Sequence, residues 1–94
     1  MRDYTGEIVK AGFGREKGGL FCVVGATPQG RLLLADGKRR KIARPKVKSL
    51  GHVWFIPAHN PFDHPAIQKL KQGEALSDKE LRRALAAFRD QLEV

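Results

Sequence analysis

The sequence has few of the features that mark secreted, disulfide-bonded or membrane-embedded proteins. It contains one cysteine, Cys22, so no internal disulfide can form. The apolar neighbours Phe21 and Val23 indicate that this cysteine is a core residue in a reducing compartment. No run approaches the roughly 18 apolar residues that a membrane helix requires, and the N-terminus lacks the apolar segment of a secretory signal. We therefore expect a cytoplasmic protein that does not enter a membrane.

The chain also has little that points to catalysis or to metal binding. His52, His59 and His64 follow no familiar zinc spacing and are interpreted as polar loop residues. The glycines of residues 12–19 fit neither the dinucleotide-binding nor the P-loop spacing. No carboxylates are paired as a general acid and base would be. We expect no catalytic residues, no metal and no cofactor, and hence a protein that is not an enzyme.

Positive charge is present in excess and is unevenly distributed. The net charge is +8, and residues 31–48 carry nearly all of it. In that segment a single acid, Asp36, is set against eight basic residues: Arg31, Lys38, Arg39, Arg40, Lys41, Arg44, Lys46 and Lys48. Such a density of like charges opposes folding unless the charges face water or a polyanion. The segment predicts either a solvated face or a nucleic-acid surface.

The first part of the chain, residues 1–56, has the pattern of short strands joined by glycine turns. Strands are expected at residues 8–9, 20–24, 31–35, 38–43 and 53–56. Asp36-Gly37 tolerates positive φ and predicts a two-residue hairpin between the third and fourth strands. Five short strands within about 50 residues favour a small barrel that closes its own edges.

Residues 57–94 predict a proline-rich crossing followed by one short and one longer helix. Pro65 suits the first turn of the short helix and Gly73 its end. Ser77 and Glu80 have the spacing of a capping box at the start of the longer helix. Its apolar stripe consists of Leu81, Leu85, Phe88 and Leu92. We expect this stripe to cover the barrel of its own chain, while docking onto a partner protein is the alternative.

One ordered set of motifs resembles the KOW motif. Residues Gly6-Glu7-Ile8-Val9 lead into Gly14-Arg15-Glu16-Lys17-Gly18, and an apolar strand follows. The resemblance continues through residues 35–38 and 45–48 and ends at His52. This longer pattern is similar to the barrel of family fourteen of the eukaryotic and archaeal ribosomal proteins and to its short bacterial relatives. It implies a mostly β fold with C-terminal α structure, an SH3-like barrel of the KOW type over residues 1–56. It also implies docking on structured RNA, usually ribosomal RNA, without catalysis.

Carried over to this chain, the resemblance implies a set of RNA-binding residues in the glycine loop and the basic segment. They are Phe13, Arg15, Lys17, Lys38, Arg39, Arg40, Lys41, Arg44, Lys46 and Lys48. The cations would contact phosphates, and Phe13 would stack on an unpaired base. Trp54 and Phe55 alternate along a strand, which predicts that one packs inward and the other toward the C-terminal helix. The alternative function is that of an adaptor of the translation or transcription machinery, docking a partner protein through the C-terminal helix.

Overall fold

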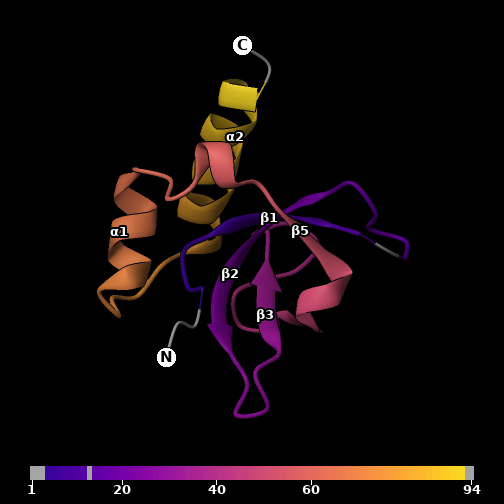
Figure 1. Ribbon diagram of the computed structural model, residues 1–94. Coiled ribbons are helices and arrows are strands. Elements are labelled where there is room, and N and C mark those ends of the chain that lie inside the picture. Colours follow the sequence, from indigo (N-terminus) through magenta and orange to yellow (C-terminus); the bar gives the residue numbers. More distant parts are fainter. Residues whose placement is uncertain (1–3, 13, 93–94) are drawn as a thin grey trace.

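An antiparallel sheet forms the centre of the protein (Figure 1). The computed structural model describes residues 4–12 and 14–92. Within these residues the sheet has five strands in the order β4-β3-β2-β1-β5. The strands are β1 (Ile8–Ala11), β2 (Leu20–Ala26), β3 (Leu32–Ala35), β4 (Lys46–Lys48) and β5 (Val53–Phe55). A single turn of 3-10 helix, η1 (Leu50–His52), joins β4 to β5. The expectation of a β-rich fold followed by helices is confirmed at this level.

The C-terminal part supplies a short 3-10 turn and two helices, η2 (Pro57–His59), α1 (Pro65–Lys71) and α2 (Asp78–Leu92). The predicted capping box is present: the amide of Glu80 donates to Ser77 Oγ at 3.1 Å, and the amide of Ser77 donates to Glu80 Oε2 at 2.9 Å. Pro65 occupies the first turn of α1, and Gly73 follows its end at a φ of 76°. Among the helices of residues 4–12 and 14–92, none has both the length and the apolar character needed to cross a bilayer.

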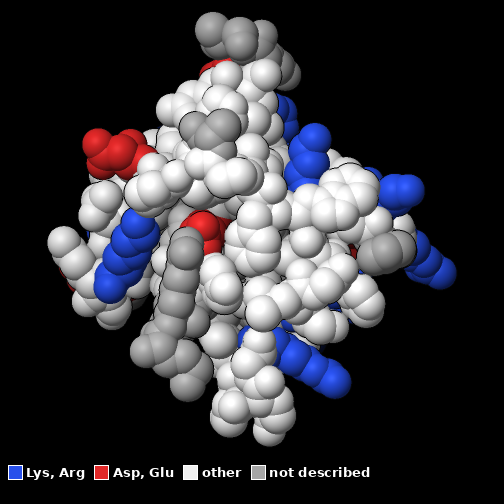
Figure 2. Space-filling model, viewed as in Figure 1, with Lys and Arg blue, Asp and Glu red and all other residues white. Residues whose placement is uncertain are grey.

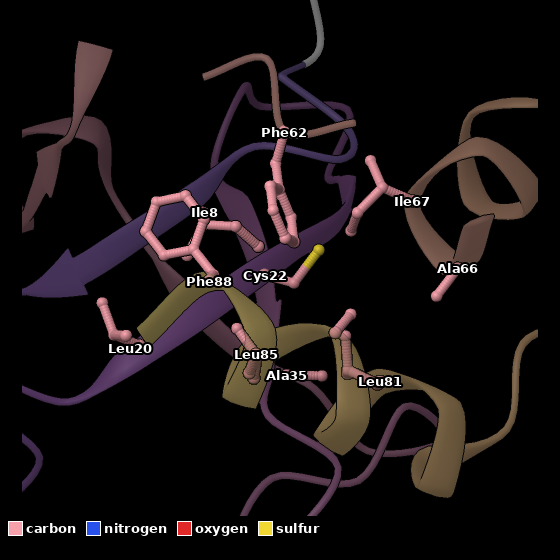
Figure 3. Close-up of a cluster of buried hydrophobic side chains, with 11 residues drawn as sticks. Ile8, Leu20, Cys22, Ala35, Phe62, Ala66, Ile67, Leu81, Leu85 and Phe88 are labelled. Atoms are coloured by element: carbon pink, nitrogen blue, oxygen red, sulfur yellow. The ribbon is translucent and has the colours of Figure 1, made fainter. Parts of the chain in front are cut away.

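One face of the sheet is buried beneath the helices (Figure 3). The contributing side chains of the sheet, which include Ile8, Leu20 and Cys22, meet a group from the C-terminal part: Phe62, Ile67, Leu81, Leu85 and Phe88. The apolar stripe of α2 therefore covers the sheet of its own chain, as predicted. Burial also raises the pKa of Cys22 to about 12, so its thiol stays protonated, and its prediction as a core residue is confirmed.

The opposite face of the sheet buries a second apolar group without help from either α-helix. This inner cluster consists of Val9, Ala11, Phe21, Val23, Leu32, Leu34 and Val53. Because successive side chains of a strand point to opposite faces, β2 sends Leu20 and Cys22 to the helices and Phe21 and Val23 to the inner cluster. The pairing of β2 with β3 is irregular between Val23 and Gly25, and such a bulge bends a strand.

The predicted hairpin at Asp36-Gly37 is wrong, and so is the strand expected at residues 38–43. The partner of β3 is β4, in the register Leu34↔Lys46 and Leu32↔Lys48, so residues 36–45 form a connecting loop. Asp36 closes this loop on itself, because its Oδ1 accepts from the amides of Lys38 and Arg40, each at 2.9 Å. An aspartate side chain that accepts hydrogen bonds from the backbone amides that follow it favours a turn over a continued β-strand.

The loop of residues 36–45 is also held by the first turns of α2. Arg82 Nη1 donates to the carbonyl oxygen of Gly37 at 2.6 Å, and the amide of Ile42 donates to Asp78 Oδ1 at 2.8 Å. Gly37 has a φ of 77°, and a Cβ there would overlap the carbonyl oxygen of Asp78. Glycine is needed at this position for its backbone conformation and for the close approach of α2.

The capping carboxylate of Glu80 predicts a pH dependence of stability. Its hydrogen bond with Lys69 at 2.7 Å, and then the amide of Ser77, lower the pKa of Glu80 from 4.5 to about 2. Because the folded pKa is depressed, the stabilisation is complete above about pH 4.5 and is lost as the pH falls toward 2. Glu80→Gln should therefore lower the melting temperature at pH 7 and have progressively less effect between pH 4.5 and 2.

Thermal melts of the wild type, Glu80→Gln and the exposed Glu74→Gln, taken at pH 7, 4.5 and 2, test this expectation. Glu74→Gln is the matched control, because it removes an exposed carboxylate that makes no side-chain hydrogen bond with residues 4–12 and 14–92. A difference between the wild type and Glu80→Gln that stays constant over this pH range would contradict the prediction.

Candidate nucleic-acid interface

The β1–β2 loop, residues 12–19, presents two cations to solvent. The amide of Gly18 donates to the carbonyl of Ala11 at 2.8 Å, and Gly14 and Gly18 adopt positive φ values of 85° and 84°. These turns leave Arg15 and Lys17 exposed at the tip. Figure 2 shows Lys and Arg side chains around the end of this loop, at the right of the view. Both cations are therefore accessible to a polyanion, and their predicted contact with RNA stays a prediction.

Two lysines of β4 extend toward the same loop, although they lie about 30 residues farther along the chain. Lys46 and Lys48 pair with Leu34 and Leu32 and therefore share the face of the inner cluster. Lys48 Nζ lies 4.0 Å from the position that a Cβ of Gly14 would take. Lys46 is close enough to contribute to the lowered pKa of Glu16. The fold thus brings the cations of β4 to those of the β1–β2 loop.

Arg40 ties the β1–β2 loop to the basic segment. Its Nη2 donates to Glu16 Oε1 at 2.9 Å and its Nε to Glu16 Oε2 at 3.0 Å. This paired hydrogen bond lowers the pKa of Glu16 and raises the pKa of Arg40. Arg40 therefore fixes the position of one basic element relative to the other, a role that the sequence did not indicate.

The remaining predicted cations lie on the loop of residues 36–45. Lys38, Arg39, Lys41 and Arg44 are all exposed. Together with the cations of the two preceding elements they make a surface that we call the basic face: Arg15, Lys17, Lys38, Arg39, Lys41, Arg44, Lys46 and Lys48. Phe13, the predicted stacking residue, lies outside the described residues, and its role stays a prediction.

Trp54 is an exposed aromatic residue beside the β1–β2 loop. The predicted alternation of Trp54 and Phe55 is confirmed, since Phe55 packs against the inner cluster with the ring of Tyr4 at 5.1 Å. The expectation that the other ring packs toward the C-terminal helix is wrong, because Trp54 remains 52% exposed. Its Nε1 lies 3.5 Å from the position of a Cβ on Gly12, and Lys10 is its cross-strand partner. Sequence reasoning missed this residue because strand periodicity does not show where a covering helix ends.

Two arginines of α2 also join the candidate interface. Arg82 and Arg89 line a cleft together with Lys38 and Arg39. From the sequence, Arg82 belongs to the polar side of an amphipathic helix. On a helix, the spacing of Arg82, Leu85 and Arg89 places all three side chains on one side. This spacing was the sequence signal that Arg82 and Arg89 lie together.

Two of the three histidines, His59 and His64, make contacts that support the fold. His64 Nδ1 accepts from the amide of Ala66 at 3.1 Å at the start of α1, and the ring of His59 meets the edge of Phe88 at 5.9 Å. In the part of the chain that the structure describes, no three His, Cys, Asp or Glu side chains gather in a group that could hold a metal ion.

Comparison with models of known protein families found no match, and a search of curated proteins found no significant relative.

Proposed function

We propose that this protein is a non-catalytic RNA-binding module and that the basic face is its contact surface. The observation that carries the proposal is the convergence of Arg15 and Lys17 with Lys46 and Lys48, which come from separate elements, around one loop. Lysine and arginine side chains neutralise phosphates, and this contact supplies most of the affinity for nucleic acid without reading its sequence. Structured RNA, such as ribosomal RNA, is the proposed class of target.

The finer fold assignment is part of the same proposal: an SH3-like barrel of the KOW type. It is supported by the inner cluster, whose members come from β1, β2, β3 and β5 and are buried without an α-helix above them. The irregular pairing at Val23 and Gly25 supports it as well, because small barrels need bent strands. The glycine-rich basic loop lies between β1 and β2, where the resemblance to the KOW motif requires it.

The alternative, an adaptor that docks a partner through α2, has less support. Leu81, Leu85 and Phe88 are buried against the sheet, so the apolar stripe is engaged within the chain. A partner protein would have to bind another side of the helix, which carries Lys79, Arg83 and Asp90. Charged helix surfaces of this kind are ordinary solvated surfaces.

A salt titration tests the proposed function without knowledge of the natural target. The logarithm of affinity for a fluorescein-labelled RNA hairpin should fall linearly with the logarithm of salt concentration, with a slope of roughly −4 to −6. That slope corresponds to about five to seven phosphate contacts. Fluorescence anisotropy measures the affinity at each salt concentration. A slope near zero, or the absence of binding, would refute phosphate neutralisation as the basis of function.

Trp54→Ala separates stacking from charge in the same titration. If the ring stacks on a base, the variant should lose roughly 5- to 150-fold in affinity at every salt concentration with little change in slope. Val47→Ala is the matched control, since Val47 is also an exposed apolar strand residue. Equal losses for both variants would show that Trp54 has no special role in binding.

A further inference from the structure

A cleft of about 320 Å³ lies between α2, the start of β2 and the loop that follows β3. The exposed edges of Leu20 and Leu85 form its apolar side, and its cations are Lys38, Arg39, Arg82 and Arg89. On α2, Leu85 lies between the two arginines on one side of the helix. The cleft thus combines an apolar floor with a cationic rim.

The acids of the cleft do not cancel its positive charge, because Glu16 is paired with Arg40 and Asp36 alone remains against four cations. Glu16 is bound by Arg40, and Asp36 Oδ1 accepts from two backbone amides of its own loop. Arg82 uses one nitrogen to donate to the carbonyl of Gly37 at 2.6 Å. A guanidinium group has five N–H donors in a fixed plane, and this anchoring bond leaves others for an anion while it holds the group in place.

The combination of an apolar floor and a cationic rim selects the chemistry of the ligand. The volume lies near the lower end of the range for small-molecule sites, which begins at about 300 Å³. An inorganic anion would need the cations alone and would gain nothing from Leu20 and Leu85. A nucleotide matches both parts, because its base is a flat ring with an apolar face and its phosphate is an anion.

We propose that this cleft binds one unpaired nucleotide of RNA, with the base against Leu20 and Leu85 and the phosphate at Arg82 and Arg89. The inference rests on the proposed RNA-binding function and adds a preference that the basic face alone would not have. A nucleotide held in a duplex would first have to be unstacked and unpaired, which costs free energy. Bulges and loops are therefore the preferred targets.

The cleft is continuous with the rest of the candidate interface. Lys38 and Arg39 belong both to its rim and to the basic face. Leu20 of the floor pairs with Lys10, which pairs in turn with Trp54 on the next strand. Neighbouring strands lie about 4.8 Å apart, so Trp54 is about 10 Å from Leu20 along this row. A nucleotide adjacent in the unpaired stretch is expected to stack on Trp54.

The test uses two RNA hairpins of equal length and charge, one fully paired in its stem and one with a bulge of unpaired nucleotides. The wild-type protein should bind the bulged hairpin more tightly. Arg89→Ala should weaken binding of the bulged hairpin on the order of tenfold, the loss expected for one charge-assisted contact, and should affect the paired hairpin much less. Arg83→Ala, an exposed arginine of the same helix outside the cleft, is the matched control and should leave the preference intact.

A second measurement probes the floor directly. The methyl resonances of Leu20 and Leu85 should shift on addition of adenosine or uridine monophosphate and stay unchanged with inorganic phosphate at the same concentration. Three results would each overturn the inference and leave RNA binding by the basic face in place. They are equal affinities of the wild type for both hairpins, equal losses of affinity on both hairpins for Arg89→Ala, and methyl shifts that inorganic phosphate alone reproduces. Failure of the wild type to bind either hairpin would remove the proposed function and this inference together.

Discussion

Reversing two charges beside the β1–β2 loop, as Arg15→Glu with Lys48→Glu, is expected to weaken RNA binding on the order of 100-fold near physiological salt. Lys48 Nζ extends to Gly14, next to Arg15, so both charges act on the same part of a bound backbone. The change removes two phosphate contacts and adds two like charges that repel the phosphates. The slope of the salt titration should become shallower by about 1.5 to 2 units.

The matched control is Lys79→Glu with Arg83→Glu. It lowers the net charge by the same amount, but both residues are exposed on α2 outside the basic face. It should reduce affinity far less and leave the slope nearly unchanged. Equal losses of affinity for the two double variants would mean that affinity follows the overall charge of the protein. The proposal that the basic face is the binding site would then be refuted. Neither change should greatly alter the melting temperature, because exposed charges contribute little to folding.

Phe88→Ala is expected to lower the free energy of unfolding by about 3 to 5 kcal/mol, the loss typical of a buried phenylalanine. Phe88 is fully buried, and its ring meets the edge of Phe62 at a centroid distance of 5.1 Å. Figure 3 shows it among the side chains of the buried cluster that includes Ile8 and Phe62. A loss of this size is a large share of the stability of a small domain. Chemical denaturation followed by tryptophan fluorescence or circular dichroism measures it.

Leu92→Ala is the comparison for this prediction, since Leu92 lies at the end of the same stripe and is only partly buried. It should cost clearly less than Phe88→Ala. A Phe88→Ala protein as stable as the wild type would mean that the stripe of α2 does not cover the sheet in solution. If such a protein also bound RNA normally but failed to retain a partner protein, the adaptor function would become the better explanation.

The helices could be predicted from the sequence because their signals are local. The capping box of Ser77 and Glu80 lies within four residues, and Pro65 and Gly73 mark the ends of α1 through their own backbone preferences. The apolar stripe of α2 predicted its buried side correctly. These features depend on residues that are close in the chain, so they could be predicted without knowledge of the tertiary packing.

The hairpin predicted at Asp36-Gly37 was wrong because its signal was local while the structure there depends on distant residues. The dipeptide favours a two-residue turn by its local preferences, and it does form a turn. Its position, however, is set by Asp78 and Arg82, which lie about 40 residues away and hold Gly37 and Ile42 against α2. These contacts move the fourth strand to residues 46–48. A contact between distant residues thus overrode a local preference.

By itself the sequence determined the concentration of positive charge, the glycine-rich basic loop, the two helices and the alternation of most of the strands. Each of these follows from composition or from a period of a few residues. Only the tertiary structure decided that Lys46 and Lys48 reach the β1–β2 loop, that Arg40 binds Glu16, that Arg82 and Arg89 join Lys38 and Arg39, and that Trp54 stays exposed. The physical reason is that these arrangements depend on which surfaces pack together, and residues up to about 50 positions apart meet only after the sheet and helices have buried their apolar faces.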